Sequence, residues 1–218
     1  MIEHFTKSEL VFNQLRDMIF SGELKPGEKV SAIDIATRMG VSRTPVNEAV
    51  KRLSDRNLVS ILPNVGFQIT VLPWEDILDL MELKVVIEST ALRWIRDRQI
   101  PVDTGPLFEL NSRILEALHS GNRTGYQECV RQYHLKFIAA ARSKPLSDSF
   151  IVIWDYSGWE DTRLQELTDN IVDQCREHEA MLNCLKNKDF ETALKISADH
   201  GRNWIDLFRR NYNGFLNA

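Results

Sequence analysis

Residues 31–49 read SAIDIATRMGVSRTPVNEA, and this stretch predicts two short helices joined by a tight turn. Ser31 is expected to cap the first helix, because its side-chain oxygen can accept a backbone N–H of the first turn. Gly40 is expected to end that helix, since glycine takes the left-handed conformation at little cost. Ser42 is expected to cap the second helix, and Pro45 suits its first turn, where no N–H is needed.

Apolar residues recur at helical spacing in both predicted helices. They are Ile33, Ile35, Ala36 and Met39 in the first, and Val46, Ala49, Val50 and Leu53 in the second. This arrangement predicts a helix-turn-helix whose second helix reads DNA. Two short helices around a glycine also occur in many other folds, so the flanking residues decide between the two interpretations.

The flanking residues indicate a winged helix. A helix is expected before the motif, from Ser8 to Phe20, with an apolar face of Leu10, Val11, Leu15, Ile19 and Phe20. The reading helix should continue to about Arg56 and stop at Asn57. Residues 58–62 and 66–71 then predict two short strands around a turn. In this order of elements, the hairpin would lie on the DNA backbone or in the minor groove.

Composition limits the function classes. The net charge of −4 excludes a globally basic nucleic-acid binder, so any DNA contact must come from a local face. Residues 1–70 carry 9 Lys/Arg against 8 Asp/Glu, whereas the remainder carries 18 against 23. The three cysteines match no zinc or disulfide spacing, which favours a reduced cytoplasmic protein. No apolar run approaches a membrane span, and the N-terminus shows no signal-peptide pattern.

The chain after Pro73 predicts only helices. We expect a domain boundary here, with a winged helix-turn-helix over residues 1–72 and an antiparallel helical bundle over 73–218, so the fold class is mostly α. The expected helices cover residues 74–98, 107–118, 126–142, 146–156, 161–186 and 189–211. Ser157–Gly158 marks a possible interruption between the fourth and fifth of them.

The first 70 residues strongly resemble the GntR family of bacterial transcription regulators. The resemblance is carried by residues 22–27 (GELKPG), 40–46 (GVSRTPV), Glu48-Ala49, Leu53, Leu58-Val59 and 63–66 (PNVG). It implies DNA contacts by Ser42, Arg43, Thr44, Asn47, Lys51, Arg52 and the wing residue Gly66. Arg43 is the expected base reader, while the hydroxyls of Ser42 and Thr44 suit phosphates or helix capping.

Asn47 departs from the family, which usually has Arg at this position. Arg prefers the O6 and N7 acceptors of guanine, whereas Asn can pair bidentately with adenine. We therefore expect an operator that differs from the usual one at that base step. The alternative is that Asn47 contacts only phosphate or water, and Lys51 and Arg52 could equally form a solvated face.

The second part resembles the helical effector domain of the FadR-like branch of the family. The matching positions are Glu82-Leu83-Lys84, Glu88, Tyr133-His134, Glu177-His178, Asp189, Ala193 and His200. The resemblance implies a metal, zinc or nickel, held by His134, His178 and His200. Taken without the resemblance, each of these three would be an ordinary core or surface histidine.

Three positions depart from that branch. Val130 stands where the family has an Asp ligand, so water or an effector carboxylate would complete the metal site. Lys84 replaces an Arg and could attract an acidic effector as a point charge, or pair with Glu88 one turn on. Lys144 replaces an Asn, and Arg131, three residues before His134, is a further candidate effector contact.

The sequence thus predicts a transcription regulator, a repressor by family analogy, that binds an operator as a homodimer and senses a small acidic metabolite. The rival interpretation is a metal-dependent hydrolase. The lack of an evident general base beside the histidines argues against it. A third is a regulator whose effector pocket has decayed.

Overall fold

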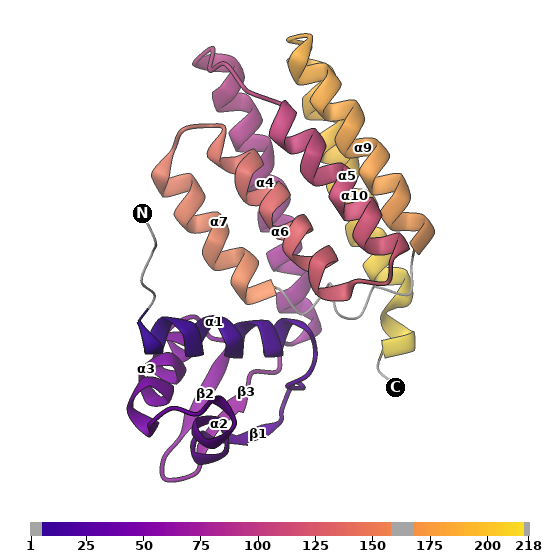
Figure 1. The fold of residues 1–218 in the computed structure, drawn as a ribbon. Helices are drawn as coiled ribbons and strands as arrows, with labels where there is room; N and C mark the ends of the chain where they lie inside the picture. Colours follow the sequence, from indigo (N-terminus) through magenta and orange to yellow (C-terminus); the bar gives the residue numbers. More distant parts are fainter. Residues whose placement is uncertain (1–5, 158–167, 216–218) are drawn as a thin grey trace. The chain divides into compact units, whose positions relative to one another are not determined.

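The computed structural model describes residues 6–157 and 168–215, and its contacts divide the chain into two units, Met1–Pro73 and Trp74–Ala218 (Figure 1). The interruption expected at Gly158 and the first residues of the helix expected over 161–186 lie outside the described residues. No helix in the described ranges is long and apolar enough to cross a membrane.

The first unit is a winged helix. Its helices are α1 (Lys7–Phe20), α2 (Ala32–Met39) and α3 (Arg43–Ser54), and its strands are β1 (Lys29–Ser31), β2 (Val59–Leu62) and β3 (Gly66–Ile69). The antiparallel sheet has the order β1-β3-β2, with Ser60 opposite Gln68 and Val30 opposite Phe67. The sequence did not predict β1, because three residues are too short to show an alternating pattern.

The motif begins and turns as its sequence predicts. The Ser31 hydroxyl accepts a hydrogen bond from the Asp34 N–H at 3.3 Å, and Gly40 has φ 64°. Ser42 occupies the N-cap position of α3 as expected, but its side chain makes no capping hydrogen bond. Asn57 ends the segment after α3 in the left-handed conformation, with φ 58°.

Two expected core residues are exposed instead. Leu10 on α1 is 53% exposed and Ile33 on α2 is 54% exposed. Leu10 lies one residue before the buried Val11, and Ile33 lies two residues before the buried Ile35, so the paired side chains point about 100° and about 200° apart. The core therefore takes Val11 and Ile35 and leaves Leu10 and Ile33 in solvent.

The second unit consists of helices throughout its described part, as the sequence predicts. They are α4 (Trp74–Asp97), α5 (Gly105–His119), α6 (Arg123–Ala139), α7 (Lys144–Ser157), α9 (Thr168–Lys186) and α10 (Phe190–Phe215). In Figure 1, α4, α6 and α7 lie side by side, as do α5, α9 and α10. The core between them is aromatic and aliphatic, with Tyr133, Phe137 and Phe150 almost fully buried.

Candidate DNA-binding surface and metal site

The helix α3 divides its residues between the core and solvent. Val46, Ala49, Val50 and Leu53 are buried against the rest of the unit. The candidate DNA contacts Ser42, Arg43, Thr44, Asn47, Lys51 and Arg52 are all exposed. The Ser42 hydroxyl makes no capping bond, which leaves it available for a phosphate.

Arg52 is exposed yet committed to an intramolecular contact. Its guanidinium lies 4.4 Å from the centre of the Phe12 ring, and that of Arg56 lies 4.9 Å from the same centre. Arginine over an aromatic face is attracted by the ring quadrupole. Arg52 therefore ties α3 to α1, which distinguishes it from Arg43, Asn47 and Lys51.

The wing is uncharged and partly apolar. No Lys, Arg, Asp or Glu occurs between residues 57 and 74, and Val65 at the turn is 60% exposed. Gly66 has φ 147°, and a Cβ added to it would meet the Val30 carbonyl oxygen at 2.1 Å. The glycine is therefore required for the close approach of β1 to β3, whatever DNA contact it makes.

In the second unit, the chain brings together the three histidines singled out in the sequence. His134 comes from α6, His178 from α9 and His200 from α10, and one ring nitrogen of each lies within 4.8 Å of those of the others. His178 and His200 are buried, and His134 is 13% exposed at its side chain. Imidazole nitrogens at this spacing from separate helices can hold one divalent ion.

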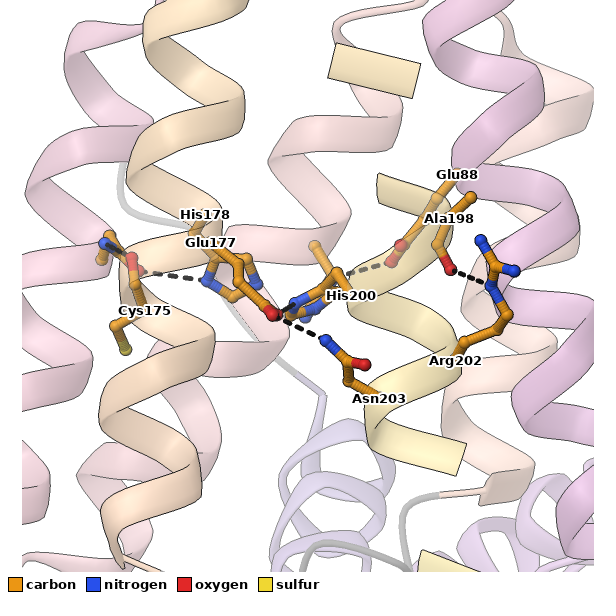
Figure 2. A network of polar contacts seen from close by, with 10 residues as sticks. Glu88, Cys175, Glu177, His178, Ala198, His200, Arg202 and Asn203 are labelled. Carbon is orange, nitrogen blue, oxygen red and sulfur yellow. Dashed lines mark hydrogen bonds and ion pairs between the residues drawn. The ribbon is translucent and has the colours of Figure 1, made fainter. Parts of the chain in front are cut away.

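Each histidine is oriented by a hydrogen bond from Nδ1. His134 Nδ1 lies 2.7 Å from Glu88 Oε1 on α4, and His200 Nδ1 lies 2.8 Å from Glu177 Oε2 on α9. Figure 2 shows Glu177 between His200 and Asn203. The Asn203 amide donates a hydrogen bond to Glu177 Oε1, the carboxylate oxygen that does not face His200. Carboxylates accept these bonds, so the proton sits on Nδ1 and the Nε2 lone pair is free to bind a metal.

His178 is oriented by Asn111 on α5. The Asn111 amide nitrogen donates to the Cys175 carbonyl at 2.8 Å, so its oxygen accepts from His178 Nδ1 at 3.1 Å. Asn111 is not predicted from the sequence, and neither Glu88 nor Glu177 is predicted to contact the histidines. Asn111 could have been recognised because it is a polar residue on the otherwise apolar helix face formed by Leu107, Ile114 and Ala117.

The electrostatics favour a neutral His178 and ionised carboxylates of Glu88 and Glu177. Burial, with the charges of His200 and His134, lowers the pKa of His178 well below its usual value. The hydrogen bond from His200 lowers the pKa of Glu177 despite partial burial. Burial alone would raise the pKa of Glu88, but the charge and hydrogen bond of His134 outweigh it and the pKa is lowered. A metal binds the neutral form of histidine.

One buried atom is left without a partner at this cluster. Within the described residues, His178 Nε2 is shielded from solvent and has no hydrogen-bond partner. An unpaired buried polar atom costs free energy unless a ligand, water or ion satisfies it. The orphaned nitrogen, the converging rings and the oriented Nδ1 atoms together fit a divalent metal. Val130 lines the same cavity from α6 and supplies no fourth ligand.

The candidate effector contacts separate in the structure. Lys84 lines the cavity beside the histidines, with its ammonium 4.3 Å from the centre of the Trp154 ring. Arg131 instead lies 3.5 Å from the buried carboxylate of Asp155. Lys144 is 83% exposed at its side chain and pairs with Asp148 at 2.6 Å. Neither Arg131 nor Lys144 is among the residues that line this cavity.

A winged helix-turn-helix followed by a helical unit with a histidine-lined cavity defines a DNA-binding protein with a separate helical domain. Residues 7–69 match the model of bacterial regulatory proteins of the gntR family, and residues 79–203 match that of the FCD domain. The chain belongs to the FadR-like, FCD-containing branch of the gntR family. Members of the family are transcription regulators, so the hydrolase interpretation is rejected.

Individual relatives cover most of the chain. A transcriptional regulator of Bacillus subtilis, YdhC, is 27% identical over 201 residues, which is 87% of this chain and 85% of YdhC. The gluconate operon transcriptional repressor of the same organism is 26% identical and covers 89% of this chain and 80% of its own length. The solved structure of Escherichia coli McbR/YncC has the same fold, with a TM-score of 0.82, 22% identity and coverage of 95% and 99%.

Proposed function

We propose that this regulator is a cytoplasmic homodimeric repressor. In this proposal, residues 1–72 bind the operator, and residues 73–218 form the dimer and bind a small acidic metabolite beside a zinc or nickel ion. The similarity to a gluconate operon repressor supports repression. Effector binding would weaken DNA binding only by favouring one placement of the two winged helices over another.

The observation that carries the metal part of the proposal is the convergence of His134, His178 and His200, each oriented from Nδ1. When bound, the ion would supply a buried positive charge for an acidic ligand. Glu88, Glu177 and Asn111 would hold the rings in place for it.

Metal analysis of the untagged full chain, purified without chelator, tests this part. We expect about one equivalent of zinc or nickel per chain, lost in His134→Ala. His119→Ala is the matched control, because His119 is exposed at the end of α5 and away from the cluster. Absence of metal from the unmodified protein, or its retention in His134→Ala, would contradict the proposal.

Selection of duplexes from a random pool, followed by anisotropy measurements, tests the DNA part. We expect the selected site to be two-fold symmetric. In Arg43→Ala the free energy of DNA binding should weaken by roughly 1–3 kcal/mol, and specificity should relax at one base pair. Arg113→Ala on α5 is the control, since it removes an exposed positive charge from the other unit. Binding by Arg43→Ala that matches the unmodified chain would exclude Arg43 as a base reader.

A further inference from the structure

The cavity beside the three histidines is small. Its volume is about 70 Å³, space for about five to seven water-sized groups. A ligand that fills it without rearrangement therefore has a short skeleton. A six-carbon sugar acid, which carries a hydroxyl on nearly every carbon, exceeds this space.

The wall of the cavity is mainly hydrocarbon and aromatic. These lining residues are Met81, Val85, Ile114, Tyr126, Val130, Trp154, Ile171, Trp204 and Ile205. Each hydroxyl of a ligand needs a hydrogen-bond partner once it leaves water. Apart from the histidine cluster, the polar groups at the wall are those of Lys84, Glu88, Gln174, Cys175 and the Tyr126 phenol, together with the indole N–H donors of Trp154 and Trp204. Glu88 is already engaged by His134.

The charges at the wall favour a single anionic group. Lys84 and Glu88 contribute one positive and one negative charge, and the histidines are neutral when they bind a metal. A divalent ion at the cluster would leave an excess of positive charge at one end of the cavity, next to Lys84. The opposite lining offers no formal charge among the described residues.

We propose that this cavity selects a short, apolar monocarboxylic acid of about three to five carbons, branched or unbranched. The carboxylate lies at the end formed by Lys84 and the histidine cluster, and the hydrocarbon end packs on the wall that includes Ile171 and Ile205. This inference rests on the proposed effector role of the cavity, and it names the chemical class of the effector.

Calorimetry on the full-length, zinc-loaded protein tests the inference with isobutyrate, isovalerate, isobutyramide and D-gluconate as probes. We expect both acids to bind at least tenfold more tightly than gluconate. Isobutyramide has the shape of isobutyrate without its charge, and we expect it to bind at least tenfold more weakly. Equal binding of the amide would overturn the anionic part, and equal binding of gluconate would overturn the apolar part.

Two substitutions probe the two ends of the cavity. Lys84→Met keeps the length of the side chain but removes its charge, so affinity for isovalerate should fall at least tenfold. Ile205→Asp places a carboxylate in the hydrocarbon wall and should abolish acid binding. Val152→Asp is the control, because Val152 is 58% exposed on α7 and lies outside the cavity lining. Unchanged binding in both cavity variants would overturn the inference.

Zinc content and operator binding are measured on the same preparation, so that the two proposals fail separately. Protein that binds zinc and operator but none of the acids would overturn the effector class alone. Protein that lacks zinc yet binds the acids with the expected ranking would overturn the metal proposal alone.

Discussion

Gly201 of α10 packs directly against Val85 of α4: a Cβ on the glycine would lie 2.2 Å from a Val85 methyl carbon. A real Cβ cannot occupy that position, so the two helices approach as closely as they do only because residue 201 is glycine. The contact adjoins His200 along the chain and lies in the lining of the cavity. It therefore fixes where α10 presents its histidine.

Gly201→Ala is expected to destabilise the protein by about 1–3 kcal/mol, because the added methyl overpacks the contact. The helix propensity of alanine acts in the opposite direction, by about 1 kcal/mol. Urea denaturation should report the loss of stability, and competition for zinc should report a loss of zinc affinity, because the contact positions His200. The double variant Val85→Ala/Gly201→Ala removes the clash and should recover most of the stability; a loss in the double variant as large as in the single one would contradict this.

Glu88→Ala is expected to weaken zinc binding by about 10- to 100-fold, since it removes the acceptor that holds His134. Glu88→Gln retains an acceptor oxygen and should lose less. Chelator competition measures both, with Glu179→Gln on the exposed side of α9 as the control. Equal zinc affinity in Glu88→Ala and the unmodified chain would show that the hydrogen bond has no part in metal binding.

Burial raises the pKa of the Cys175 thiol from 9.0 to about 12. Between these values the unfolded chain loses the proton and the folded chain keeps it, so stability should fall as pH rises above 9. The slope approaches about 1.4 kcal/mol per pH unit. Urea denaturation at pH 8, 9 and 10 measures this slope. The free energy of unfolding of Cys175→Ala should fall less steeply over this range than that of the unmodified protein. Parallel curves for the two proteins would refute the assignment.

The uncharged wing should add little to the salt dependence of DNA binding. A lysine placed at its tip by Val65→Lys should tighten binding and steepen the slope of log K against log salt by about 0.9, the effect of one neutralised phosphate. Val152→Lys adds the same charge to the second unit and should leave the slope unchanged. An unaltered slope in Val65→Lys would mean that the tip lies away from the DNA backbone.

Asn47→Arg should move base preference toward guanine at one position in each half-site, since Arg and Asn present different donors to the major groove. Parallel selections on the two proteins measure the change. An identical preferred site in both would indicate that residue 47 contacts phosphate or water.

The sequence predicted the helix-turn-helix because its boundaries depend on local chemistry, at Ser31 and Gly40. It misplaced Leu10 and Ile33, because apolar character alone does not fix the direction of a short helix's buried face and packing decides it. The three histidines were grouped by resemblance, since residues 134, 178 and 200 are too far apart for spacing to join them. Asn111 was missed because its partner, His178, is supplied by another helix.

Trp154 lies with Lys84 on its ring and the His134 ring 5.1 Å away. The indole therefore touches both the cation and one of the histidines at the end of the cavity, and it is almost completely shielded from water. Indole emission is sensitive to nearby charge. The protein consequently carries an intrinsic optical probe at this position, and occupancy of the cavity can be followed in unlabelled protein, with Trp154→Phe to identify the signal.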